Sequence, residues 1–130
     1  LKGVEYVQST LNIIEHFKRL NSSLKFFIEN PRGKLRKLGV VQELPRTTIW
    51  YCTYGDSRAK PTDIWSNFIY GLDNPNGWIP RAECHNGNKN CHHESAPRGS
   101  QTGTQGRKGN YERSKIPSEL CKEVMLKCKL

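Results

Sequence analysis

The composition of residues 74–114 restricts the fold most, because this region is rich in Gly, Asn, Ser, Pro, His and Lys and holds few aliphatic side chains. Such a region buries too little apolar surface to form a core of its own. The core must therefore come from residues 1–73 and residues 115–130. We expect residues 74–114 to be an irregular insert, held in place by specific contacts or by a metal ion.

The residues before the insert predict one helix and three strands. Apolar side chains at steps of three and four predict a helix of about four turns. They are Val4, Val7, Leu11, Ile14 and Phe17. Residues 24–28 form an aromatic run that suits a buried strand closed by Pro31. Residues 47–54 have high β-propensity, and residues 63–68 follow closely enough to form a hairpin with them.

The residues after the insert predict a final helix. Pro117 stands where the first residue of a helix would be, and Glu119 would lie in its first turn. The apolar face of this helix would consist of Leu120, Cys121, Val124 and Cys128. Because a helix followed by a buried strand is the repeating unit of a parallel sheet, we expect an α/β domain to which residues 115–130 return.

The charge balance favours a polyanionic partner such as nucleic acid, since 21 Lys and Arg face 12 Asp and Glu, a net charge of +9. No apolar run approaches the roughly 18 residues of a membrane span, and no signal-peptide core follows Leu1. We therefore expect a cytoplasmic protein without a membrane partner, whose five cysteines are reduced thiols or metal ligands. A chain of 130 residues that starts with Leu is expected to be a piece of something longer.

A candidate ligand site follows the first predicted strand. In open α/β sheets, ligands bind outside the carboxyl ends of the strands, which places Glu29 and Asn30 at the rim of a site. The alternative is that Glu29 caps a neighbouring helix. The basic run directly after it would grip phosphates beside the site, or form a solvated surface. This run contributes Arg32, Lys34, Arg36 and Lys37.

The insert offers two further candidates. Two cysteines separated by six residues and followed by histidines predict a metal site, which we assign to Cys52, Cys84, Cys91 and His92, with His93 as the alternative imidazole. The other interpretation is that these side chains are polar fill. Residues 96–109 mix glycines with side chains that suit phosphates and base edges, unless they form a disordered linker. The candidate DNA contacts there are Arg98, Gln101, Thr102, Thr104, Gln105, Arg107 and Lys108.

Three segments in a fixed order resemble the C-terminal half of cytosine-C5 DNA methyltransferases, in particular divergent members from phages and other viruses. They are residues 27–31 (Phe-Ile-Glu-Asn-Pro), residues 50–67 with Asp56-x-Arg58-x-Lys60, and residues 113–121 with Ser114-Lys115-Ile116-Pro117. The resemblance implies the second half of a Rossmann-like, S-adenosylmethionine-dependent methyltransferase sheet. The irregular insert would then be the part that recognises the DNA target.

The resemblance also implies roles for single residues. In the family a Glu-Asn pair holds the flipped cytosine, and Glu29 and Asn30 occupy that place. A Gln-x-Arg-x-Arg segment helps to bind the target nucleotide, and its nearest match contains Arg58 and Lys60, with different residues at its first and last positions. A Gly-Asn-x-Val-Pro motif lies on the cofactor side. Its counterpart here is Ser114, Ile116 and Pro117.

Two parts of such an enzyme are missing from this sequence. It has no Gly-rich loop to seat S-adenosylmethionine, and none of its cysteines follows a proline as the family's nucleophile does. We therefore expect a chain that binds the target base and DNA but is inactive alone, with the cofactor loop and nucleophile on a second chain or an N-terminal half. A stand-alone DNA-binding module, with or without zinc, and a truncated remnant without function remain as alternatives.

Overall fold

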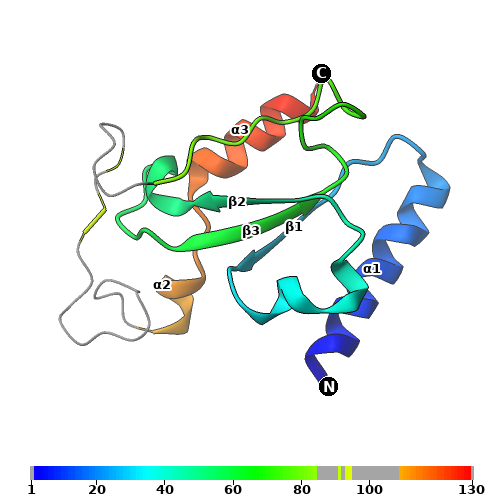
Figure 1. Ribbon diagram of the computed structural model, residues 1–130, viewed down its shortest axis with the longest axis horizontal. Coiled ribbons are helices and arrows are strands. Elements are labelled where there is room, and N and C mark those ends of the chain that lie inside the picture. Colours follow the sequence, from blue (N-terminus) through cyan, green and yellow to red (C-terminus); the bar gives the residue numbers. More distant parts are fainter. Residues whose placement is uncertain (1, 85–90, 92, 95–108, 130) are drawn as a thin grey trace.

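The computed structural model describes residues 2–84, 91, 93–94 and 109–129 (Figure 1). Its centre is a three-stranded antiparallel sheet in the order β1-β3-β2. The strands are β1 (Phe27–Pro31), β2 (Arg46–Trp50) and β3 (Pro61–Ser66). The α-helices are α1 (Lys2–Leu20), α2 (Asn110–Ser114) and α3 (Ser118–Cys128). Short 3₁₀ helices are η1 (Lys34–Lys37), η2 (Gly39–Val41) and η3 (Tyr51–Tyr54).

The predicted hairpin is confirmed, since β2 pairs antiparallel with β3 and Thr48 lies opposite Asp63. The extent of its first strand was wrong, because residues 51–54 turn into η3. Gly55 ends this turn with a φ of +86°, a left-handed conformation that glycine adopts without strain. Backbone bonds from Gly55 N to Cys52 O and from Asp56 N to Tyr51 O close the turn.

The first strand starts later than the aromatic run predicted, at Phe27, and it includes Pro31. Proline is tolerated there because β1 is an edge strand of the described sheet. Strand β3 lies between β1 and β2, so both pairings in the described part of the chain are antiparallel. The Rossmann-like class of the whole fold stays a prediction.

The core lies on the side of the sheet that faces α3, which runs along this side in Figure 1. It combines residues from the sheet, η3, α3 and the insert: Ile49, Tyr51, Tyr54, Ile64, Trp78 and Leu120. The expectation that residues 74–114 stay outside the core was therefore wrong at Trp78, whose large apolar ring is 1% exposed. The final helix is confirmed, with Pro117 just before its first residue and with Leu120 buried. Cys121 was placed wrongly on the apolar face, because it is exposed.

Helix α1 lies at one end of the molecule (Figure 1), and none of its residues is buried. The predicted stripe is partly covered at Val4, Val7, Leu11 and Ile14, but Phe17 is 51% exposed. Phe17 belongs instead to a second apolar row with Tyr6, Ile13 and Leu20, all of them exposed. In the described part of the chain, no helix combines the length and hydrophobicity that a membrane crossing requires.

Candidate functional site

One end of the sheet gathers the predicted base-binding residues around Tyr51. There β1 and β2 end and β3 begins, with Arg32 N donating to Pro61 O at 3.0 Å. The Tyr51 hydroxyl donates a hydrogen bond of 2.6 Å to Glu29 Oε1. Tyr51 is fully buried. Burial, and then the bond to Glu29, raise the pKa of Tyr51, so its hydroxyl stays a donor at neutral pH.

Two cations lie against the ring of Tyr51. The Arg58 guanidinium carbon is 5.1 Å and the Lys60 Nζ is 5.0 Å from the ring centroid, both within cation–π range. Lys60 has a φ of +26°, which is strained for a residue with a side chain. Burial, and then the charge of Arg58, lower the pKa of Lys60. The structure thus brings Glu29, Arg58 and Lys60 together.

Arg58 is completely buried and its donors are engaged. Its Nε and Nη2 donate to the Asp56 carboxylate at 2.9 and 2.7 Å. It also donates to the carbonyl oxygens of Arg113 and Lys115, both at 2.7 Å. Arg58 therefore fixes the segment before α3 against the turn between η3 and β3. In this arrangement it has no surface to offer to DNA.

Asn30 lies on the opposite face of the sheet from Glu29, because neighbouring side chains of a strand alternate. Glu29 pairs with Ile64, whereas Asn30 pairs with Asp63. The Asn30 side chain donates to the carbonyl of Pro31 at 2.8 Å. The structure therefore does not bring the two side chains into one pocket.

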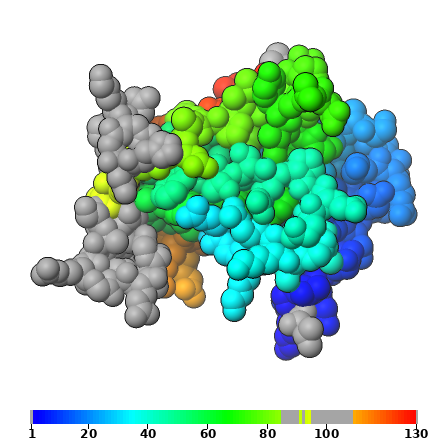
Figure 2. All heavy atoms as spheres, viewed as in Figure 1, coloured from blue at the N-terminus to red at the C-terminus, as the bar shows by residue number. Residues whose placement is uncertain are grey.

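The basic run divides into one structural residue and three surface residues. Arg36 donates to Asp63 Oδ2 and to Thr48 Oγ1, both at 2.9 Å, and the Asp63 side chain is fully buried. Burial acts to raise the pKa of Asp63, but the hydrogen bonds from Arg36 and Thr48 outweigh it and lower this pKa. Lys34 and Lys37 are exposed, and Arg32 lies over the Trp50 ring at 5.5 Å. Figure 2 shows the segment of this basic run in cyan at the surface.

The predicted metal ligands Cys52, Cys84 and Cys91 are confirmed as members of one cluster with His93. Their ligand atoms all lie within 4.8 Å of one another. Cys91 Sγ is 3.2 Å from Cys84 Sγ and 2.9 Å from His93 Nδ1. This Cys3His cluster could hold a metal ion such as zinc. His92, the histidine that we assigned to the site, lies outside the described residues. The imidazole in the described cluster is that of His93, which the sequence analysis gave as the alternative.

The electrostatics of the cluster suit a cation. Burial acts to raise the pKa of the Cys91 thiol, but hydrogen bonds from Cys52, His93 and Cys84 outweigh it and lower this pKa to about 6. Burial raises the pKa of Cys52. A thiolate is the form of cysteine that binds metal, so the cluster supplies at least one metal-binding group at neutral pH.

Both described flanks of the insert are tied to η3 and to the turn after it. Tyr54 accepts a hydrogen bond of 2.9 Å from Arg81 N, and Ser57 O accepts one of 2.8 Å from Glu94 N. The Arg81 guanidinium also donates to Thr53 O at 2.8 Å. These contacts place Cys84, Cys91 and His93 beside Cys52.

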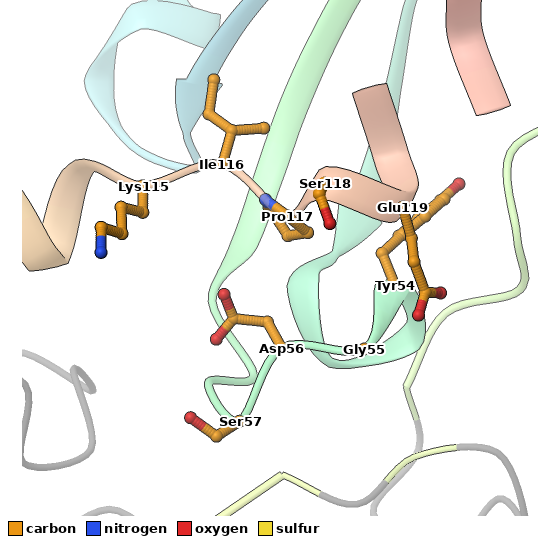
Figure 3. A pocket seen from close by; sticks show the side chains of 9 residues that line it. All are labelled: Tyr54, Gly55, Asp56, Ser57, Lys115, Ile116, Pro117, Ser118 and Glu119. Carbon is orange, nitrogen blue, oxygen red and sulfur yellow. The ribbon is translucent and has the colours of Figure 1, made fainter. Parts of the chain in front are cut away.

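A pocket of about 480 Å³ lies between residues 54–57 and residues 115–119 (Figure 3). Two of the predicted cofactor-side residues, Ile116 and Pro117, line it. The third, Ser114, does not, since its hydroxyl donates to Tyr111 O within α2. Figure 3 shows the turn with Asp56 and Ser57 facing the start of α3 at Ser118.

The sequence interpretation missed the residues that partner the predicted cations and the predicted carboxylate. The sequence interpretation assigned Tyr51 to a strand. Its place beside Arg58 and Lys60, two predicted site residues, indicates a role in the site only once the turn η3 is known. Asp56 and Asp63 gave no pattern that pointed to Arg58 and Arg36. The predicted DNA contacts at Arg98, Gln101, Thr102, Thr104, Gln105, Arg107 and Lys108 lie outside the described residues.

No family model, no curated protein and no solved structure matches this chain.

Proposed function

We propose that this chain is the target-base and DNA-binding portion of a DNA (cytosine-5-)-methyltransferase. The observation that carries the proposal is the carboxylate of Glu29, held by the buried hydroxyl of Tyr51 beside the ammonium of Lys60. Glu29 Oε2 accepts no hydrogen bond from the described residues, so this oxygen is available to a ligand. The motif order in the sequence supplies the rest of the argument.

The geometry suits a cytosine that has left the duplex. Extrusion costs a few kcal/mol, which contacts in the pocket and to phosphates must offset. Glu29 would accept a hydrogen bond from the exocyclic amine and share a proton with the ring nitrogen. The proton on the ring nitrogen would make the cytosine ring electron-poor and prepare it for nucleophilic attack. Lys60 would donate to the base or to its phosphate.

The surface beside Glu29 suits the DNA backbone. Arg32, Lys34 and Lys37 are exposed and follow Glu29 directly in the chain. Lysine and arginine contacts to phosphates supply affinity without reading sequence, so target choice falls to the insert between residues 74 and 114.

Catalysis would need parts that this sequence lacks. A second chain or an N-terminal half would bring the nucleophile and most of the S-adenosylmethionine site, in the cytoplasm of a bacterium or a phage-infected cell. The pocket lined by Ile116 and Pro117 is where this chain would touch the cofactor. For the Cys3His cluster we propose Zn²⁺, since three sulfurs and one imidazole nitrogen form a structural zinc set.

The metal cluster also favours a second candidate, a stand-alone zinc-stabilised DNA-binding module. The two candidates differ in their dependence on Glu29. We would measure affinity by fluorescence anisotropy for one duplex with an unpaired cytosine and for the same duplex with an abasic site. We expect roughly a tenfold preference for cytosine, equal to about 1.4 kcal/mol, and its loss in Glu29→Gln.

The matched control is Glu15→Gln, because Glu15 is an exposed carboxylate on α1. This variant should keep the preference for cytosine. Salt-sensitive binding without any preference in the unaltered chain would support the module and contradict the methyltransferase proposal. Aggregation without any DNA binding would instead support a truncated remnant.

A further inference from the structure

The metal cluster joins two parts of the chain that are far apart in sequence. Cys84, Cys91 and His93 belong to the insert, whereas Cys52 belongs to η3. Cys52 is buried, and it is the residue directly after Tyr51. A metal ion in this cluster would therefore bind the residue that is next in sequence to Tyr51, whose hydroxyl holds Glu29.

The distances fit one small tetrahedral ion. Zinc–sulfur bonds of about 2.3 Å give a tetrahedron with edges of about 3.8 Å. The distance from Cys84 Sγ to Cys91 Sγ is 3.2 Å and that from Cys84 Sγ to His93 Nδ1 is 3.6 Å. No pair of ligand atoms is more than 4.8 Å apart. An ion at the centre needs only sub-ångström adjustments of these side chains.

Among the described residues, the backbone–backbone hydrogen bonds of η3 are long, although the Arg81 side chain adds a bond of 2.8 Å to Thr53 O. The backbone–backbone bonds measure 3.4 Å from Gly55 N to Cys52 O, 3.2 Å from Asp56 N to Tyr51 O and 3.5 Å from Tyr51 N to Lys60 O. The described flanks of the insert add two backbone-donor bonds, at Tyr54 and Ser57. Four metal–ligand bonds would be the strongest link between the insert and this turn.

We propose that a zinc ion bound by Cys52, Cys84, Cys91 and His93 fastens the insert to η3 and thereby holds the Tyr51 hydroxyl on Glu29. Loss of the ion loosens the turn and weakens the recognition of an extrahelical cytosine. The last consequence rests on the proposed function, whereas the metal site and its effect on η3 do not.

The first measurement is the metal content of the purified chain after loading with Zn²⁺ and removal of the excess. We expect one zinc per chain, and a visible Co²⁺ spectrum typical of tetrahedral thiolate coordination after exchange. Cys52→Ser should lower zinc affinity at least a hundredfold, while Cys52→His should restore tight binding. Cys121→Ser is the matched control, because Cys121 is exposed and lies outside the cluster. Unchanged zinc affinity in Cys52→Ser would overturn the assigned ligand set.

The second measurement is hydrogen–deuterium exchange with and without zinc. We expect faster exchange at residues 51–58 after chelation, at least tenfold, and unchanged protection of β3. Equal exchange of residues 51–58 in both states would overturn the link. Exchange that rises equally throughout the sheet would also overturn it, since the ion would then support the whole fold and not this turn.

The third measurement repeats the comparison of unpaired cytosine with an abasic site after chelation and after zinc is restored. We expect the tenfold preference to fall to about twofold and then to return. In Glu29→Gln, chelation should change nothing further. A preference that survives chelation contradicts the consequence for base recognition. If the zinc-loaded chain shows no preference while zinc still protects η3, the proposed function fails and the metal link stands.

Discussion

The contact between Tyr51 and Glu29 can be tested by removing one oxygen atom. Tyr51→Phe keeps the buried ring and deletes the 2.6 Å hydrogen bond to Glu29 Oε1. Hydrogen bonds to charged groups contribute roughly 1.5–3 kcal/mol. Glu29 is only partly buried, so water replaces part of the deleted hydrogen bond. We therefore expect the variant to lose about 1.5 kcal/mol of unfolding free energy at pH 8.

The pH dependence separates the contribution of a buried, protonated phenol from an effect on packing alone. The pKa of Tyr51 is raised in the folded chain, by burial first and by the bond to Glu29 second. The stability that comes from the protonated phenol is thus fully present below the ordinary tyrosine pKa of about 10 and is lost above it. The loss amounts to about 1.4 kcal/mol per pH unit. The difference between the unaltered chain and Tyr51→Phe should almost vanish by pH 11.

The assay is urea unfolding followed by tryptophan fluorescence, at intervals between pH 8 and pH 11. Tyr54 also has a raised pKa, of about 12, but both proteins contain it and its contribution cancels in the difference. Tyr6→Phe is the control, because Tyr6 is 73% exposed on α1 and should show no difference at any pH. A stability difference for Tyr51→Phe that stays constant up to pH 11 would refute the buried, protonated phenol on which the assigned hydrogen bond depends.

Two further predictions concern the opposite face of the sheet and the basic surface. Asp63→Asn should lower the unfolding free energy by about 3 kcal/mol at pH 7, because Arg36 loses a buried partner. Urea unfolding should show a smaller difference at pH 3. The reason is that the pKa of Asp63 is lowered in the folded chain, so its contribution to stability disappears as the pH falls below about 4. A difference under 1 kcal/mol at pH 7 would contradict this role. Lys34→Gln with Lys37→Gln should reduce the salt dependence of DNA binding, by about 0.9 in the logarithmic slope for each phosphate that the variant no longer neutralises. Lys2→Gln on α1 should leave the slope unchanged, and an equal slope in the double variant would place the phosphate contacts elsewhere.

The sequence predicted those parts of the structure that depend on local patterns. The hairpin of β2 and β3 and the helix α3 follow from β-propensity, turn residues and a proline at the right place. The end of β2 was missed, because residues 51–54 have high β-propensity and do not predict the 3₁₀ turn that the left-handed Gly55 closes. The contact of Tyr51 with Glu29 joins residues 22 positions apart, which no local pattern reveals.

The same reasoning explains the outcome at the metal site. Three of its four described ligands were predicted, since two cysteines separated by six residues with adjacent histidines indicate a metal site that needs one more distant ligand such as Cys52. The choice between His92 and His93 was not predictable, because both follow Cys91 within two residues and spacing does not distinguish them. Cys52 was predicted as the distant ligand, but its distance from the other three was not predictable, since it depends on how the flanks of the insert fold back.

Arg58 and Lys60 differ in how many of their hydrogen-bond donors are engaged, although the family resemblance gives both the role of binding the target nucleotide. Arg58 is saturated by Asp56 and by carbonyl oxygens of the segment before α3. Among the described residues, Lys60 donates to one oxygen, that of Arg113, although an ammonium carries three N–H donors. Its backbone is strained at a φ of +26°, and burial, followed by the charge of Arg58, lowers its pKa. Because Asp56 already neutralises Arg58, the charge opposite Glu29 is that of Lys60. Under the proposed function, Lys60 is therefore the cation that would meet the target nucleotide.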